Sequence, residues 1–571
     1  MAQVTRLYSG FRGVDFRGED VSLSRSPDSI NMWRDYRQVG GICTRPALER
    51  LQGFQIERTG LFGMFLFDNS LFVHAGVVLF RFSFDENGKI SDGPTILSTQ
   101  MNRRKSLGFT FADALYIMDG KTYWYIERGS NLINAVTPHI PTTTIGRKPA
   151  GGGTVLEDVN MLSPYRINSF VGDGTSTEYV LDGPMEPEGA QEDPVTVWIN
   201  GVETNAFTFA RNEEGAGKIT FEVAPPAPLT DGQDNVKIQY LRWVEGADDA
   251  IYGCTQVQVF DNRVFLTGNP NYPNVVWHSS LNDPTYFSDL DYYRDGVDDA
   301  RITGMVAGNN ALWVFRENSD SNTTIFYHVP TIDDSYGKIY PSAHSSITTG
   351  CIGKAINFND DIVFFSEKGM EGISGDITTE QVLGHRSSLV DRKLTSEPGY
   401  KDMILCEWEG YLLVFIGNHV YLADSRSVFQ HENHMEYDWY YWELEFAVEA
   451  AKVYNGVLYL WSNEVIYTVT GDGDVESYWV TPKDRFQYPN MQKTTNKRGC
   501  IAEATGDVSV WAKTDKSEFE HIGDHKGVTD YFASRIKRKK FKDLQIKFAS
   551  STRFSLEQVS IEAFVGGYIK R

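Results

Sequence analysis

A β-hairpin pattern that returns at a regular interval is the feature that most constrains the fold of this chain. In each unit an alternating apolar run meets a short polar turn and a second alternating run follows, as in MFLFDNSLFVHAGVVLFRF from Met64. Such alternation, rich in Val, Ile, Tyr, Phe and Trp, is typical of strands, and Asn-Gly or Asn-Asp pairs supply the positive φ of tight turns. The first turns fall at Asn69, Asp113, Asn262, Asn309, Asp360, Gly410 and Gly456.

The gaps between these turns are 44, 149, 47, 51, 50 and 46 residues. Repeats of this length, each long enough for four short strands, are the signature of a β-propeller, because one unit cannot bury both faces of its sheet unless neighbours stack on it. We therefore predict an all-β fold with a six- or seven-bladed β-propeller. A row of separate β-sandwiches with evenly spaced turns is the alternative.

The 149-residue gap contains a segment that breaks the rhythm. Its runs STEYVLDG, DPVTVWINGVETNAFTF and NVKIQYLRWV indicate short strands of their own, so we predict an inserted β-sandwich. After about Val475 the rhythm stops again, and alternating runs there predict a C-terminal β-domain. The predicted division is 1–149 for the N-terminal segment and first blades, 150–245 for the insert, 246–475 for the other blades and 476–571 for the last domain.

The net charge and the distribution of apolar residues argue against several classes of protein. With 76 Asp+Glu against 54 Lys+Arg, the net charge is −22, which argues against a protein that grips nucleic acid over its whole surface but not against one that nucleic acid slides past. No window approaches 18 uninterrupted apolar residues, so we expect no membrane-spanning helix. The start lacks the apolar core of a secretory signal, and five scattered cysteines are typical of a chain made in a reducing cytosol.

Two groups of residues are candidates for contact with a partner. A basic cluster near the end could meet an acidic neighbour or a second copy of the chain, although a solvated strand edge explains it equally well. An aromatic run could stack on a sugar or a protein, although core packing is the favoured explanation. The candidate interaction residues are Arg535, Lys537, Arg538, Lys539, Lys540, Trp439 and Trp442.

The sequence lacks the common catalytic motifs. The sequence holds no GxxxxGK[ST], no GxGxxG after a strand, no GxSxG and no HExxH. The nearest approach to a metal site is the run HENHMEYD, in which two imidazoles with nearby carboxylates could hold a divalent ion, but a polar loop is favoured. Its candidate ligands are His431, Glu432, His434, Glu436 and Asp438.

Acidic runs give two further candidates. Asp472, Asp474 and Glu476 alternate as in a calcium loop but lack the full pattern, so a turn is favoured. The cluster Asp289, Asp291, Asp295, Asp298 and Asp299 could supply a carboxylate pair for glycoside hydrolysis. Loop carboxylates are common in so acidic a chain, and we predict a protein that is not an enzyme, with no catalytic, cofactor-binding or metal residues and no cofactor.

Three stretches resemble a known family. The run SPDSINMWRDYRQVGGICTRPALERLQGF resembles the opening of tail accessory proteins of short-tailed bacteriophages, although Ala47 stands where that family has Gly after Arg-Pro. The segments WVFRENSDSNTTIFYHV and FNDDIVFFSEKGMEGIS follow in the family's order, and the basic strand and closing strand over 535–563 resemble its finish. The chain thus resembles a tail nozzle, or tail stabilisation, protein of the β-propeller type.

The resemblance implies a structural subunit of a viral tail, made in the host bacterial cytoplasm and located in the virion. In that family the subunits form a ring, usually a homohexamer, that extends the portal-adaptor channel for DNA ejection. The ring holds a tail fibre, needle or plug. Six copies at −22 each would give a wall with a charge on the order of −130, past which genome DNA slides without sequence-specific binding. A carbohydrate-binding or carbohydrate-degrading propeller is the alternative function.

Overall fold

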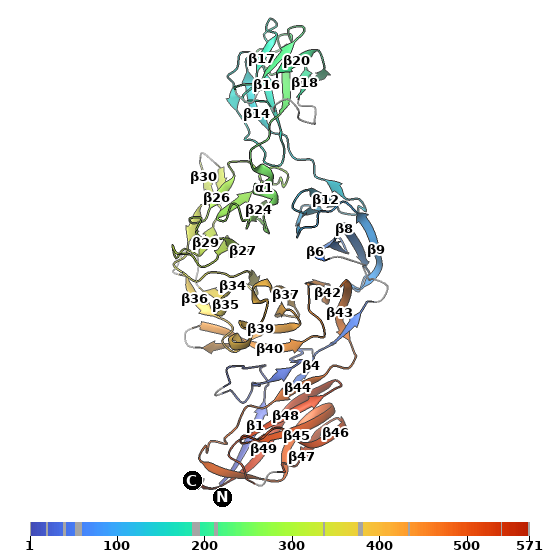
Figure 1. Ribbon diagram of the computed structural model, residues 1–571, viewed down its shortest axis with the longest axis vertical. Helices are drawn as coiled ribbons and strands as arrows, with labels where there is room; N and C mark the ends of the chain where they lie inside the picture. The colour runs from blue at the N-terminus through green and yellow to red at the C-terminus, as the bar shows by residue number, and fades with distance from the viewer. Residues whose placement is uncertain are drawn as a thin grey trace.

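The computed structural model describes residues 2–18, 21–37, 41–51, 60–185, 195–210, 215–334, 337–374, 381–431, 434–537 and 540–568. Three bodies lie in line along the longest axis (Figure 1). A ring of small sheets occupies the middle, an inserted sandwich lies at one end, and a β-domain that holds both ends of the chain lies at the other. The predicted all-β class is confirmed.

Seven blades form the ring within the described residues, which agrees with the predicted six or seven. Six blades are separate four-stranded sheets, and the sixth blade belongs to a larger sheet. The first three blades are β6 (Leu61–Phe67), β7 (Ser70–Ala75), β8 (Val78–Phe84) and β9 (Ile90–Ser98); β10 (Leu107–Phe111), β11 (Ala114–Met118), β12 (Tyr123–Glu127) and β13 (Asn134–Ala135); and β23 (Gln256–Phe260), β24 (Arg263–Thr267), β25 (Val275–His278) and β26 (Tyr292–Arg294).

The other four blades follow in chain order around the ring. They are β27 (Ile302–Gly308), β28 (Ala311–Arg316), β29 (Ile325–His328) and β32 (Ser342–His344); β33 (Ala355–Phe358), β34 (Asp361–Ser366), β35 (Gly369–Ser374) and β36 (Val382–His385); β37 (Ile404–Trp408), β38 (Tyr411–Ile416), β39 (His419–His431) and β40 (His434–Glu443); and β41 (Ala450–Tyr454), β42 (Val457–Ser462), β43 (Val465–Gly471) and β5 (Ala47–Arg50). A side hairpin of β30 (Thr331–Asp333) and β31 (Gly337–Ile339) extends from the fourth blade.

The turn chemistry of the sequence explains why each blade begins with a tight hairpin. Residues in the first turn take the left-handed conformation, such as Asn262 at φ 57°, Asp360 at φ 63° and Gly456 at φ 78°. Only in the second blade does a neighbour, Ala112 at φ 48°, replace the predicted Asp113 among these left-handed residues. The second strand of a blade is covered on both faces, because flanking blades pack on it, and all six residues of β7, β28 and β38 are buried.

The ring is closed by a strand from the other end of the sequence. The seventh blade takes its first three strands from residues 450–471, and its fourth is β5, which pairs antiparallel with β43. Strand β41 in turn contacts β6 of the first blade. The N-terminal strand β5 therefore completes the last blade, which in turn packs against the first blade.

The insert is a β-sandwich with its own core. One sheet holds β15 (Thr154–Val155), β14 (Thr142–Arg147), β16 (Tyr165–Phe170), β22 (Val236–Leu241), β18 (Val195–Ile199) and β19 (Val202–Thr204). The other sheet holds β17 (Glu178–Val180), β21 (Lys218–Phe221) and β20 (Phe207–Ala210). Buried Phe170, Tyr179 and Ile219 fill the space between the sheets. The short helix α1 (Ala247–Tyr252) follows where the chain returns to the ring.

The terminal domain is built from both ends of the chain. Its C-terminal strands are β44 (Ser477–Val480), β45 (Met491–Thr514), β46 (Glu520–Val528), β47 (Tyr531–Ser534), β48 (Leu544–Ser550) and β49 (Phe554–Tyr568). Its N-terminal strands are β1 (Ala2–Ser9), β2 (Ser29–Ile30), β3 (Met32–Trp33) and β4 (Ile42–Thr44). Because β1 pairs with β49 and β3 pairs with β40, one sheet runs from the terminal domain into the sixth blade. The sequence prediction had grouped the N-terminal segment with the first blades instead.

Helices are short throughout the described residues. The others are α2 (Asp391–Leu394) and one 3-10 turn, Tyr400–Asp402, both between the fifth and sixth blades. In the part of the chain that the structure describes, no helix has the length and apolar character that crossing a membrane requires.

Candidate functional site

The predicted aromatic contact residues lie in the core. Strand β40 carries the run, and its Trp439 and Trp442 are 0% and 2% exposed. Trp439 Nε1 donates a hydrogen bond to the carbonyl of Arg386 at 3.0 Å, and the Trp442 ring packs edge-on against Trp33. The two tryptophans are therefore packing residues, as the favoured explanation of the aromatic run predicts, and their listing as candidate contact residues is wrong, because a buried ring cannot stack on a sugar or a partner.

The basic cluster lies on the surface of the terminal domain. Arg535, Lys537 and Lys540 are exposed and lie between β47 and β48, not in a strand as the sequence predicted. The Lys537 ammonium donates to the carbonyl of His521 at 2.7 Å. Arg538 and Lys539 lie outside the described residues. Three cations therefore point to solvent at the end of the molecule opposite the insert, where a neighbour could meet them.

Two carboxylates of the acidic cluster in the third blade form hydrogen bonds or ion pairs within the fold. Asp295 is fully buried, and its two carboxylate oxygens accept hydrogen bonds from Ser342 Oγ at 2.6 Å and from His328 Nε2 at 3.0 Å. Asp299 pairs with buried Arg316 at 2.7 Å. Burial raises the pKa of Asp291 to about 6, with the charges of neighbouring carboxylates adding to the effect. Asp295 and Asp299 thus have structural partners within the fold.

A cavity of about 600 Å³ lies where the ring meets the terminal domain. Arg45 and Arg50 line it together with Glu443, Glu445 and Glu476. Burial lowers the pKa of Arg45 to about 10, although the charge of Glu445 opposes the shift. Sequence reasoning did not find this cavity, because its walls come from segments some 400 residues apart.

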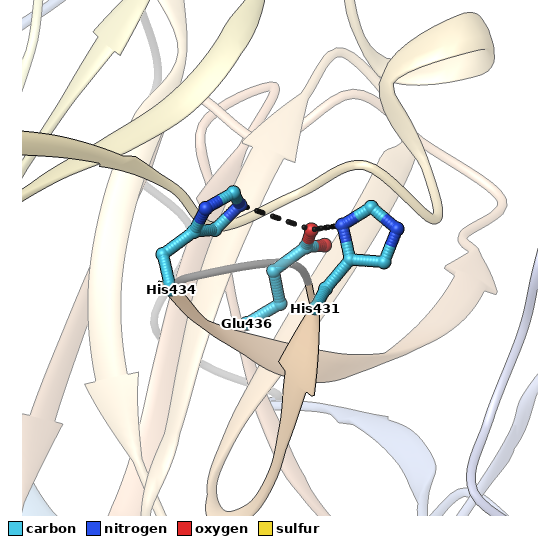
Figure 2. Close-up of side chains that lie close together, drawn as sticks. All are labelled: His431, His434 and Glu436. Atoms are coloured by element: carbon cyan, nitrogen blue, oxygen red, sulfur yellow. Dashed lines mark ion pairs between the residues drawn. The ribbon is translucent and has the colours of Figure 1, made fainter.

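Two histidines and a glutamate meet at the end of the β39–β40 hairpin (Figure 2). His431 is the last residue of β39 and His434 the first of β40, and the two are directly paired in the antiparallel register. Glu436 lies two residues further along β40, hence on the same face as His434. The sequence had favoured a polar loop here; instead, these three residues lie in strands, and their side chains converge.

The three donor atoms are close enough to share one small ion. Nδ1 of His431 lies 2.9 Å from Oε1 of Glu436, and Nε2 of His434 lies 3.5 Å from that oxygen. One donor atom from each residue falls within 4.8 Å of the others. Of the other predicted ligands, Asp438 is not part of this group, because it pairs with Arg12 at 2.7 Å and Arg25 at 2.6 Å. Glu432 lies outside the described residues.

The carboxylate of Glu436 is buried and held on one side only. Its side chain is 0% exposed, and Oε2 accepts hydrogen bonds from the backbone N–H of Ser388 at 3.2 Å and from the Ser388 hydroxyl. Within the described residues, Oε1 of Glu436, Nδ1 of His431 and Nε2 of His434 make no hydrogen bond of ordinary geometry, although they are within ion-pair distance.

A second charged group lies near Glu436 and consists of His385 at the end of β36, Asp391 at the start of α2 and Glu371 in β35. His385 Nε2 is 2.5 Å from Asp391, and Nδ1 is 3.1 Å from Glu371. Burial alone would lower the pKa of His385, but hydrogen bonds with these two carboxylates outweigh it and raise the pKa to about 10. The His385 imidazole is therefore protonated and forms ion pairs with both Asp391 and Glu371.

Comparisons with known proteins give distant likenesses. No family model and no curated protein matches the chain. Among solved structures, BamB from Moraxella catarrhalis is 11% identical with a TM-score of 0.29, over 75% of this chain and 97% of that one. PorZ of Porphyromonas gingivalis is 12% identical with a TM-score of 0.23, over 94% and 76%. The PQQ domain of pyranose dehydrogenase from Coprinopsis cinerea is 10% identical with a TM-score of 0.27, over 74% and 97%. Likenesses this weak carry no argument about function.

Proposed function

We propose that this chain is a structural subunit of the tail nozzle of a short-tailed bacteriophage, where copies form a ring around the channel for DNA ejection. The arrangement of three bodies along one axis is the observation that supports this proposal most (Figure 1). It places two surfaces, the insert and the terminal domain, on opposite sides of the ring, separated by the full width of the propeller. A subunit placed between an adaptor and a fibre or plug needs two such surfaces.

The closure of the fold supports a structural role. The N-terminal segment pairs with the terminal domain through β1, with the sixth blade through β3 and with the seventh blade through β5. Both ends of the chain are thereby fixed within sheets, and opening the ring requires that β5 separate from β43. Buried backbone pairing of this kind resists local unfolding.

The distribution of charge on the chain indicates how the proposed subunit would meet DNA and its neighbours. A net charge of −22 repels phosphate, so DNA would slide along a wall of such subunits. The exposed cations Arg535, Lys537 and Lys540 form a local basic cluster, and we assign them to an acidic surface on a neighbouring copy or adaptor. The alternative is a carbohydrate-binding or carbohydrate-degrading propeller. We favour it less because the tryptophans proposed to stack on a sugar are buried.

Light scattering of the full chain, mixed with the portal and adaptor proteins of the same particle, tests the proposal. We expect a species that contains about six copies of 64.5 kDa. Charge reversal at Arg535, Lys537 and Lys540 should lower the fraction of this species. As a matched control, charge reversal at three exposed blade lysines should leave it unchanged; these are Lys89, Lys121 and Lys368. A single-copy mass in every mixture would overturn the proposal, as would turnover of a glycan.

A further inference from the structure

We propose that His431, His434 and Glu436 bind one divalent transition-metal ion of the zinc type, at a site that leaves one coordination position open. The proposal does not depend on the proposed tail function. It rests on the donor set, the spacing of the donor atoms and the burial of the carboxylate.

The donor set selects the class of ion. Two imidazole nitrogens and one carboxylate oxygen are a combination that Zn²⁺ and its neighbours in the transition series prefer, whereas Mg²⁺ and Ca²⁺ prefer oxygen ligands alone. Three protein ligands leave the fourth tetrahedral position for water or for a group from outside the chain. His431 and His434 are 38% and 23% exposed, so an ion has a path to the site from solvent.

Two of the three donor spacings fit a tetrahedral ion. Zinc lies about 2.0–2.1 Å from nitrogen and oxygen ligands, which places neighbouring donors of a tetrahedron about 3.3 Å apart. The observed separations of 2.9 Å and 3.5 Å from Oε1 of Glu436 to the two imidazoles bracket that value. The hairpin register holds this spacing, because His431 and His434 are a cross-strand pair and Glu436 follows on the same face.

The buried carboxylate points to a cation. An ionised group that is 0% exposed is costly unless it is paired and hydrogen-bonded. Ser388 satisfies Oε2 from the side away from the histidines, which is how an outer partner orients a metal-binding carboxylate. Oε1 accepts no hydrogen bond within the described residues and faces the two imidazoles.

The surroundings also hold the site rigid. Arg386 donates to the carbonyl of Met435 at 3.1 Å, and Trp439 donates back to the carbonyl of Arg386 at 3.0 Å. These bonds fix the segment that carries Ser388 against β40. All three ligands of a bound ion would come from the outer hairpin of the sixth blade, and the hydrogen bonds of Ser388 to Glu436 connect them to the segment that leaves the fifth blade.

Titration of the metal-free full chain with ZnCl₂ tests the site. The chain is prepared without a polyhistidine tag, stripped with a chelator and studied by calorimetry, and we expect one equivalent of Zn²⁺ to bind. His431→Gln and His434→Gln should each weaken binding on the order of 100-fold. His521→Gln is the matched control, because His521 is exposed beside Asp524 on the terminal domain and should not affect binding.

Cobalt provides a second readout that does not depend on stability. Co²⁺ in the same site should give the visible absorption of a four-coordinate ion in the wild-type chain and in His521→Gln, and lose it in both site variants. Glu436→Gln is a weaker test, because the substituted side chain is buried and the variant could fail to fold. The proposal is overturned if the wild-type chain binds no Zn²⁺, if the two site variants bind as well as the control, or if Mg²⁺ binds in place of Zn²⁺.

Discussion

Replacement of Trp33 by alanine should loosen the junction between the ring and the terminal domain. The Trp33 side chain is 2% exposed and stacks on Trp408 with ring centroids 5.4 Å apart and planes at 12°. It also contacts Trp442 edge-on at 5.6 Å. Burial of an aromatic ring of 150–250 Å² at about 25 cal/mol per Å² is worth about 4–6 kcal/mol, and Trp→Ala substitutions in cores cost about 3–5 kcal/mol. We expect a loss of about 4 kcal/mol.

Hydrogen exchange followed by mass spectrometry measures this loss locally, which matters because a chain of several bodies does not unfold in one step. A loss of about 4 kcal/mol corresponds to roughly thousand-fold faster exchange in β3, β37 and β40. The insert has its own core and should keep its exchange rates. Trp243→Ala is the control, because Trp243 is 44% exposed and its loss should cost under about 1 kcal/mol. Equal effects of the two substitutions on β40 would refute the reasoning.

Two other predictions concern pH and backbone conformation. Burial lowers the pKa of His278 to about 4, so the folded chain holds this imidazole in its neutral form. The free energy of unfolding is therefore highest above pH 6.5, the ordinary pKa of the unfolded chain's imidazole, and falls by about 3 kcal/mol in total as the pH drops toward 4. We expect the free energies of unfolding of the wild-type chain and of His278→Gln, measured from pH 7 to 4, to converge at low pH. A difference that stays constant over this range would contradict the prediction. Gly13 has φ +84°, and an added Cβ would lie 1.9 Å from the carbonyl oxygen of Trp439, whereas Gly10, at φ +61°, has open space. Gly13→Ala should cost about 3 kcal/mol or more and Gly10→Ala about 1 kcal/mol, as thermal melting would show; equal melting temperatures would count against the packing described here.

The blades could be predicted because their signal is local. A tight hairpin needs residues that tolerate positive φ, and Asn69, Asn309 and Gly410 take that conformation at the predicted turns. The regular interval between the turns then indicates repeated units without any knowledge of their contacts. The insert was visible for the same reason, because it interrupts the interval.

The closure of the ring could not be predicted because its pairing is remote. Strand β5 is four residues long and pairs with β43, more than 400 residues later, and nothing local in ALER specifies that neighbour. The same holds for β1, whose partner β49 lies near the other end of the chain. A short strand of ordinary composition carries no information about which distant edge it completes.

The candidate site was visible in part. The spacing of His431 and His434 drew attention to two imidazoles, but the burial of Glu436 and its contact with Ser388 depend on how the fifth blade packs on the sixth. The aromatic run shows the opposite case. Core packing of Trp439 and Trp442 was favoured but not fixed by the sequence, since alternation within a strand indicates two faces but not what covers each of them.

The central claim, that this chain is a tail subunit, is tested most directly by a cryo-electron microscopy map of the phage particle proposed to contain it. The account predicts several copies in a ring around the DNA channel below the portal and adaptor. In each copy the seven-bladed propeller should lie between the inserted sandwich and the terminal domain. A map in which the chain is absent from the tail, or is bound singly away from the channel, would contradict the account.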